Sequence, residues 1–205
     1  PTAQYCKDTE NGKSDYPIVP GREYSGIVVA TGNGVKRIHP GDKVVSQLSR
    51  GGSYTHYLKV PKTNLYKLPP GVLLKQGSLV DSISACLNGI RRLRVQDRAT
   101  TCVIGAGPLG NICAQILRRN GSDVMAVDQD ERLLRLLHKY DVNTWQDLES
   151  TDRFDCLIDT TGRQQEVSQL IERAKPSSKI LLIGPNAKEM TQQFVGILPN
   201  DGRNL

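Results

Sequence analysis

The sequence has few aromatic residues and no long apolar run. Aromatic residues make up 5% of the 205 residues, which leaves little surface on which nucleic-acid bases could stack. No segment approaches the roughly 20 consecutive apolar residues of a membrane-spanning helix. No basic segment followed by an apolar stretch opens the chain, as it would in a secretory leader. We therefore expect no membrane partner and no export, and we do not expect nucleic acid as a partner.

Cysteine is also scarce, and its spacing excludes two common uses. The sequence has five cysteines, an odd number, and none is spaced as Cys-x-x-Cys. This pattern fits neither a disulfide framework nor a zinc ribbon, and it favours a reducing compartment, the cytoplasm. Four of them fall on apolar faces and are predicted to be core residues rather than ligands: Cys86, Cys102, Cys113 and Cys156.

Charge is distributed unevenly along the chain. The 27 basic and 21 acidic residues give a net charge of +6. Residues 1–75 contain 11 basic and five acidic residues, whereas residues 76–205 contain 16 of each. The excess favours a solvated basic face, and less strongly the attraction of an anionic substrate.

The first third of the chain has the pattern of a small β domain. Short β-branched runs at 27–30 and 43–45 predict strands, and turn sequences separate them at 31–34, 39–42 and 50–53. Tyrosines 54, 57 and 66 lie in what we predict to be a further strand pair. The sequence Pro69-Pro70-Gly71 ends this pattern, so we predict a barrel or sandwich with a domain boundary near residue 75.

Beyond residue 75 the period changes to that of alternating helices and strands. Apolar residues at 79, 83, 87 and 90 predict an amphipathic helix. Strands are then predicted at 101–104, 124–127, 156–158 and 179–183, and helices at 108–119, 132–139 and 167–174. This alternation predicts an α/β domain with a doubly wound parallel sheet covered on both faces.

The strongest motif is the glycine-rich sequence GAGPLG at 105–110. It follows a predicted strand, opens a predicted helix, and precedes Asp128 at the end of the next strand by 18 residues. Gly105 permits a tight turn, Gly107 lets a pyrophosphate approach the backbone, and Gly110 lets the helix pack on the strand. Pro108 and Leu109 begin the helix whose N–H groups would face the phosphates. The alternative is a glycine turn that binds nothing.

Asp128 indicates which dinucleotide would bind. A carboxylate there would accept hydrogen bonds from the adenosine ribose hydroxyls and would repel a 2′-phosphate, so NAD is favoured over NADP. Thr160, Thr161 and Gly184 end two further strands, where ligands of such sheets lie. We predict that they line the cofactor site, with ordinary turn capping as the alternative for the threonines.

Together these segments resemble the medium-chain dehydrogenase/reductase superfamily. The resemblance lies in YPIVPGREYSGIVV (16–29), PGDKV (40–44), GGSYTHY (51–57), LPPG (68–71) and the glycine-rich half that follows. It implies a GroES-like β-barrel domain, assigned to 1–75, and a Rossmann dinucleotide-binding domain, assigned to 76–205. It also implies hydride transfer between a nicotinamide cofactor and an alcohol, polyol or carbonyl substrate, with the zinc alcohol and polyol dehydrogenases as the nearest branch.

The chain departs from this family at the catalytic metal. Members usually carry Gly-His-Glu, in which the histidine binds zinc, but this chain has Gly21-Arg22-Glu23. The other positions that match zinc ligands are Cys6, Glu23 and Asp81, so any metal would have to use these three. Arg22 can pair with either carboxylate instead, so we predict a metal-free site in which Arg22 or Thr9 polarises the substrate carbonyl. The predicted catalytic residues are Cys6, Thr9, Arg22, Glu23 and Asp81.

Two further differences concern segments of the family. The lobe that binds a structural zinc is absent, and the sequence matches neither the opening strands nor the last Rossmann strand, through which dimers of the family usually form. We therefore expect a fragment or a shortened member, for which a homo-oligomer would need another sheet edge. Two alternatives to the polyol dehydrogenase are a zinc-free quinone or enoyl reductase and a catalytically silent dinucleotide-binding or scaffold protein.

Overall fold

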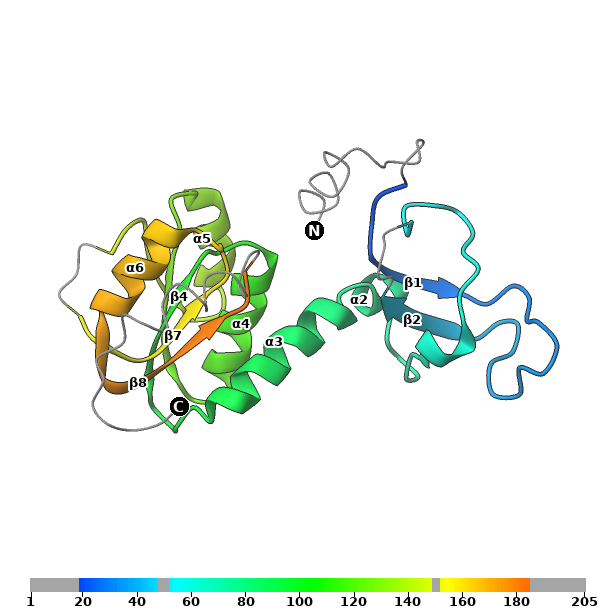
Figure 1. The fold of residues 1–205 in the computed structure, drawn as a ribbon, viewed down its shortest axis with the longest axis horizontal. Helices are drawn as coiled ribbons and strands as arrows, with labels where there is room; N and C mark the ends of the chain where they lie inside the picture. The colour runs from blue at the N-terminus through cyan, green and yellow to red at the C-terminus, as the bar shows by residue number, and fades with distance from the viewer. Residues whose placement is uncertain (1–18, 48–51, 149–151, 185–205) are drawn as a thin grey trace. The chain divides into compact units, whose positions relative to one another are not determined.

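The computed structural model describes residues 19–47, 52–148 and 152–184. The chain divides into two compact units, Pro1–Ser84 and Ala85–Leu205. Both are drawn in Figure 1, and each is described here by itself. The boundary at residue 75 predicted from the sequence stays a prediction.

The first unit contains a small antiparallel sheet. Its strands β1 (Glu23–Ile27), β2 (Lys43–Gln47) and β3 (Tyr66–Lys67) lie in the order β1-β2-β3. Val44 and Val45 of the central strand are buried. A 3-10 helix, η1 (Lys62–Asn64), precedes β3, and the short helix α2 (Leu74–Gly77) follows it. A Cβ atom on Gly77 would lie 2.7 Å from Leu68 Cδ1, so a larger residue there would require the Leu68 side chain to move.

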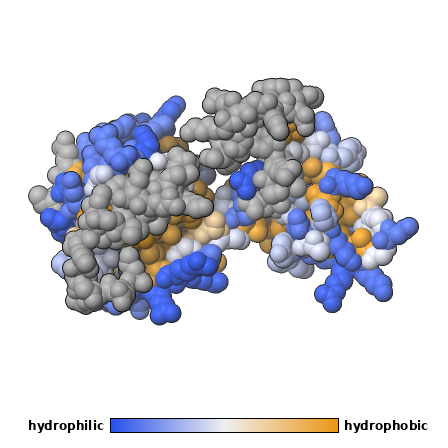
Figure 2. Space-filling view, viewed as in Figure 1, coloured by the Kyte–Doolittle hydropathy of each residue, from blue (hydrophilic) through white to orange (hydrophobic). Residues whose placement is uncertain are grey.

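The first strand lies earlier than the sequence predicted. The apolar run at 27–30 predicted a strand there, but β1 occupies Glu23–Ile27 and pairs Glu23 with Gln47 and Ile27 with Lys43. The ladder continues only to Val28, which exchanges backbone hydrogen bonds with Gly41 and Asp42. Val29 beyond it is 68% exposed. Of the strand pair predicted around the three tyrosines, only β3 forms. Figure 2 shows hydrophilic side chains projecting from this unit between apolar patches.

Helix α3 (Val80–Leu93) agrees with the helix predicted from the apolar spacing, but only its second half is a core element. Cys86, Ile90 and Leu93 are buried, whereas Ile83 is 39% exposed. Arg91 and Arg92 lie in the last turn, where a positive charge is favourable beside the carbonyl end of a helix.

The second unit is a five-stranded parallel sheet. Its strands are β4 (Thr100–Ile104), β5 (Asp123–Val127), β6 (Asn143–Trp145), β7 (Phe154–Asp159) and β8 (Ala174–Leu182), in the order β6-β5-β4-β7-β8. Helices α4 (Pro108–Arg119), α5 (Glu131–His138) and α6 (Gln164–Glu172) connect them. All four strand pairs are parallel. Figure 1 shows the helices surrounding this sheet.

Side chains of alternate residues fill a core on each face of the sheet. On one face Val103 and Ile158 pack with Leu117 of α4 and Leu137 of α5. On the other face Cys102, Ile104 and Leu157 pack with Leu170 of α6. Both faces of the sheet are therefore covered, and the predicted doubly wound α/β class is confirmed.

A polar cluster joins the amino ends of three strands. Asp155 of β7 accepts hydrogen bonds from the N–H of Thr100, over 2.9 Å, and from its hydroxyl, over 2.7 Å. Lys175 Nζ of β8 lies 3.0 Å from both carboxylate oxygens of Asp155. The Thr100 hydrogen bonds, with Lys175, lower the pKa of Asp155 to about 2. This cluster fixes the register of β4, β7 and β8 at one end.

Two findings bear on the expectations from composition. No helix in the described part of the chain is long and apolar enough to cross a membrane. The four cysteines in the described ranges are buried free thiols, as predicted for core residues: Cys86, Cys102, Cys113 and Cys156.

Candidate cofactor-binding site

The glycine-rich sequence forms a tight turn between β4 and α4. Gly105 has a φ of +92°, a backbone conformation that residues other than glycine rarely adopt. Its N–H donates to the carbonyl of Val127 over 2.8 Å. Gly107 caps α4, and Pro108 occupies the first helical position, where its missing N–H is not needed. The turn thus presents the amino end of a 12-residue helix at the carboxyl end of the sheet.

The three glycines of the turn have different surroundings. A Cβ atom on Gly110 would lie 1.7 Å from the carbonyl oxygen of Gly105, and one on Gly105 would lie 2.5 Å from Thr160 Oγ1. A side chain at Gly110 would require a shift of the backbone, and one at Gly105 would require a shift of the Thr160 side chain. Around Gly107, by contrast, no atom lies within 4 Å of the position of a Cβ. Gly107 is therefore the glycine whose open side leaves room for a ligand.

Asp128 is attached to this turn. It follows β5, and its Oδ2 accepts a hydrogen bond from the N–H of Ala106 over 2.7 Å. Its Oδ1 accepts one from the N–H of Asp130 over 2.9 Å. The carboxylate is half-buried. It is therefore held in one orientation beside the glycine turn.

The segment after β7 supports the turn from the other side. Thr160 donates to the carbonyl of Ile104 through its N–H, over 3.0 Å, and through its hydroxyl, over 2.9 Å. Gly184 is buried, and a Cβ on it would lie 2.5 Å from the nitrogen of Gly162. The hydroxyl of Thr160 is thus used in holding the backbone.

Asp159, the last residue of β7 and the first of the sequence DTTG, orders this segment. It is fully buried and accepts hydrogen bonds from the N–H groups of Thr161 and Gly162 and from the Thr161 hydroxyl, over 2.9, 3.1 and 2.7 Å. A carboxylate at the end of an apolar strand, followed by two threonines and a glycine, was the available signal. Its role is to fold the loop in which Thr160 and Thr161 lie.

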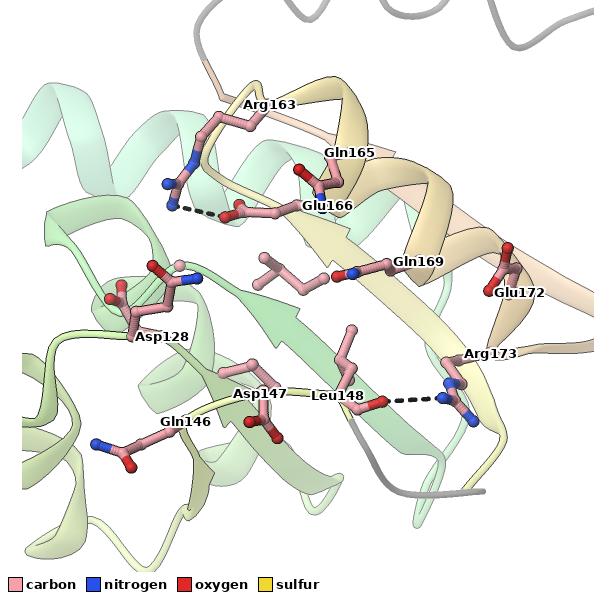
Figure 3. Close-up of a pocket in the computed structure, with 14 residues that line it drawn as sticks. Asp128, Gln146, Asp147, Leu148, Arg163, Gln165, Glu166, Gln169, Glu172 and Arg173 are labelled. Carbon is pink, nitrogen blue, oxygen red and sulfur yellow. Dashed lines mark hydrogen bonds and ion pairs between the residues drawn. The ribbon is translucent and has the colours of Figure 1, made fainter.

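A cleft of about 470 Å³ opens beside the glycine turn, at the carboxyl ends of the strands. Gly105 and Asp128 line it, and so do residues 146–148 after β6 and several residues of α6. Figure 3 shows an ion pair between Arg163 and Glu166 at this cleft, with 2.7 Å between Nη2 and Oε1. Arg173 donates to the carbonyl of Leu148 over 2.9 Å. No sequence motif marks Arg163, Glu166 or Arg173, which lie in α6 or at its two caps.

Three of the five predicted catalytic residues lie in the described part of the first unit. Glu23 Oε1 accepts hydrogen bonds from the N–H and the hydroxyl of Ser82, over 2.8 and 2.7 Å. The pKa of Asp81 is raised by burial and by the neighbouring Glu23 carboxylate, and Arg22 opposes this rise. The chain thus brings Arg22, Glu23 and Asp81 together. Cys6 and Thr9 lie outside the described residues.

Of the three candidate zinc ligands, the described residues include only Glu23 and Asp81, because Cys6 lies outside them. A catalytic zinc site needs three protein ligands and an open position. Within residues 19–47, 52–148 and 152–184, no three His, Cys, Asp or Glu side chains are grouped to hold a metal. Arg22 adds a permanent positive charge beside Asp81, and an oxygen of Glu23 is already bonded to the first turn of α3.

Comparison with known proteins agrees with this fold. Residues 3–70 match the family described as "Alcohol dehydrogenase GroES-like domain". A solved structure of galactitol-1-phosphate dehydrogenase from Escherichia coli superimposes with a TM-score of 0.78 and 22% identity, covering 93% of this chain and 69% of that one. These matches confirm the predicted resemblance: residues 3–70 match the GroES-like domain family, and the structural match shows the fold.

Two curated relatives have names that state a dehydrogenase of a polyol or of a polyol phosphate. Galactitol 1-phosphate 5-dehydrogenase of Escherichia coli (strain K12) is 27% identical over 214 residues, covering 85% of this chain and 62% of the relative. D-arabinitol dehydrogenase 1 of Uromyces fabae is 24% identical over 220 residues, covering 86% of this chain and 63% of the relative. The chain thus spans about three fifths of the length of these relatives.

Proposed function

We propose that the chain binds NAD(H). We further propose that it is an oxidoreductase, or part of one, that transfers a hydride between this cofactor and an alcohol, polyol or carbonyl compound. The observation that carries the proposal is the glycine turn with its anchored carboxylate. Gly107 is open, α4 begins at the turn, and Asp128 is held 2.7 Å from the turn's Ala106 N–H.

Each of these groups has a defined role toward the cofactor. The free N–H groups at the start of α4 would hold the pyrophosphate beside Gly107. The Asp128 carboxylate would accept hydrogen bonds from the ribose hydroxyls and exclude a 2′-phosphate, which favours NAD over NADP. The bound cofactor would accept the hydride from an alcohol or donate it to a carbonyl compound. Thr160, Thr161 and Gly184 would contribute mainly by fixing the backbone that faces it.

The substrate class is inferred from the relatives and from charge. Both relatives described above have names that state a polyol or polyol phosphate as substrate. The excess of 11 basic over five acidic residues in 1–75 would attract an anionic substrate such as a sugar phosphate. Rates with phosphorylated substrates should then fall with rising ionic strength, and those with neutral polyols should not. Rates that do not change with ionic strength would count against an anionic substrate.

We further propose that the reaction site is metal-free. Arg22 would hold a positive charge near the substrate oxygen in place of a metal ion, with Glu23 and Asp81 beside it. Because a guanidinium polarises a carbonyl less than a Lewis acid does, turnover should be slow. This same residue favours the second candidate, a zinc-free quinone or enoyl reductase. A catalytically silent binding protein is the third candidate.

A titration with NADH and NADPH, followed by NADH oxidation with a panel of carbonyl compounds, tests these candidates. Binding of NADH with turnover of ketoses or their phosphates supports the polyol dehydrogenase. Turnover of quinones or enoyl compounds alone supports the second candidate, and binding without any turnover supports the third. If neither dinucleotide binds, the proposal is wrong. The cytoplasmic location and a homo-oligomer both remain predictions.

A further inference from the structure

Two buried thiols meet between α3 and α4, outside the cleft. Cys86 of α3 and Cys113 of α4 belong to the same apolar core on one face of the sheet. The Cys86 thiol donates a hydrogen bond to the carbonyl of Leu109 over 3.6 Å. In an α-helix this carbonyl is the acceptor for the N–H four residues later, which is that of Cys113. The Cys86 sulfur therefore lies against the turn of α4 that carries Cys113.

The side chain of Cys113 is directed to the same place. Side chains of a helix tilt toward its amino end and cover the preceding turn, which here begins at Leu109. Cys113 donates a hydrogen bond to Cys86, and this bond lowers the pKa of Cys86. The same bond, together with burial, raises the pKa of Cys113. Cys86 is therefore the thiol of the pair that ionises first, and Cys113 keeps its proton.

The other two cysteines that the structure describes are placed differently. Cys102 lies in the core on the opposite face of the sheet, where burial raises its pKa to about 12. Burial also raises the pKa of Cys156, whose charged neighbours are Lys179 and Asp155. Of these four thiols, only Cys86 and Cys113 alter each other's pKa. A pair of thiols in contact, one of which ionises more readily, has the arrangement of an attacking and a resolving cysteine.

We propose that Cys86 and Cys113 form a redox modification site, which a peroxide converts into a disulfide between α3 and α4. The Cys86 thiolate attacks one oxygen of hydrogen peroxide and the O–O bond breaks. Cys86 becomes a sulfenic acid, and the departing hydroxide takes up the proton that Cys86 released. The Cys113 thiol then attacks the Cys86 sulfur, the S–O bond breaks, and the S–S bond forms as water leaves. Two thiols thus lose two electrons, and one peroxide becomes two water molecules.

The peroxide reaches Cys86 through the exposed turn of α3 that precedes it. Residues 83–85 are exposed, and Cys86 is the first buried residue of this helix. Opening of that turn uncovers the Cys86 sulfur without unfolding the sheet. Cys113 does not have to be exposed, because it meets the oxidised sulfur when the helix closes again. A dithiol reductant reverses the reaction by thiol–disulfide exchange. This site does not depend on the proposed function.

The test treats the folded, full chain with hydrogen peroxide, alkylates the remaining thiols and maps the peptides by mass spectrometry. We expect the dominant cysteine product to be a peptide pair joined through Cys86 and Cys113, with a loss of about 2 Da from the chain that dithiothreitol reverses. Cys113→Ser should abolish this link and leave a sulfenic acid on Cys86, which dimedone labels. Cys102→Ser is the matched control, because both cysteines are fully buried, and it should keep the link.

Three outcomes would overturn the proposal. The first is the absence of a link between Cys86 and Cys113 in the folded chain after peroxide treatment. The second is a dominant disulfide that joins Cys86 to another cysteine. The third is a link that forms only in urea, which would show that the folded core does not bring the two thiols into reaction. The map of the unmodified protein decides among these outcomes even if Cys113→Ser fails to fold.

Discussion

The carboxylate of Asp128 accepts a hydrogen bond from the N–H of Ala106 over 2.7 Å. This bond joins the end of β5 to the glycine turn after β4. In the proposed function, Asp128 therefore has two roles, since it orders the turn and faces the ribose. The two roles can be separated by substitutions that remove the charge with or without the hydrogen-bond acceptor.

The unmodified protein should prefer NADH to NADPH, because a carboxylate in this place repels a dianionic phosphate. Asp128→Gly should narrow the preference and also weaken NADH binding, since the Ala106 N–H loses its acceptor at a cost of about 1–3 kcal/mol. Asp128→Asn keeps an oxygen acceptor and should lose less NADH affinity than Asp128→Gly. Fluorescence titration with each dinucleotide measures both effects. Equal affinity of the unmodified protein for NADH and NADPH would refute the role of Asp128.

Two glycines of the turn offer a matched pair of substitutions. Gly107→Ala adds a methyl group in open space and should leave the thermal unfolding temperature nearly unchanged while weakening NADH binding. Gly110→Ala places the same methyl group 1.7 Å from the Gly105 carbonyl oxygen and should lower the stability of the fold. Thermal unfolding and NADH titration of both variants check this. Unchanged NADH affinity in Gly107→Ala would show that the ligand does not approach that glycine.

The Asp155 cluster should make stability depend on pH in the acid range. The pKa of the Asp155 carboxyl group is lowered to about 2 in the folded chain, from an ordinary value of 3.8. A lowered pKa means that the carboxylate stabilises the fold above pH 3.8, and that this contribution is lost as the pH falls through about 2. Because the side chain is 42% exposed, solvent screening reduces the effect to about 1 kcal/mol.

Urea unfolding of Asp155→Asn at several pH values measures this contribution. The variant should be about 1 kcal/mol less stable than the unmodified protein at pH 7, and the difference should shrink between pH 4 and pH 2. Asp97→Asn, at an exposed position outside the cluster, is the control and should behave like the unmodified protein. A difference that stays constant with pH would show that the charge of Asp155 is not responsible.

Substitution of Arg22 tests the proposed metal-free site. The purified protein should contain no stoichiometric zinc, and its activity should not respond to chelators. Arg22→His removes the positive charge and supplies an imidazole ligand, so zinc content should rise. Arg22→Lys keeps the charge and should not gain zinc. Stoichiometric zinc in the unmodified protein, with activity lost on chelation and restored by metal, would contradict the proposal.

The sequence predicted long regular elements well and short ones poorly. Helix α4 begins and ends at the predicted residues 108 and 119 because a proline, a clear apolar period and a following glycine mark its ends. Strand β6 was not predicted, since Asn143–Trp145 has only three residues and no apolar pattern. Helix α6 lies at Gln164–Glu172 rather than 167–174, and β8 already begins at Ala174. Local sequence alone did not mark that boundary.

The residues of the candidate cofactor site likewise differ in how well the sequence predicted them. The glycine motif and Asp128 could be found because their spacing reflects a fixed strand-turn-helix geometry. Glu166 and Arg163 could not, because their importance depends on which strands become neighbours. Only the order β5-β4-β7 brings the start of α6 to the cleft beside Asp128.

The buried carboxylate of Asp159 has a consequence for hydrogen exchange. The amide protons of Thr161 and Gly162 belong to the loop that follows β7 at the carboxyl end of the sheet. Both nevertheless donate hydrogen bonds to this fully buried carboxylate. Such protons exchange with deuterium only when the surrounding structure opens. These two loop amides should therefore exchange as slowly as those of β7 itself, and an early exchange at them would report opening of the sheet rather than motion of a surface loop.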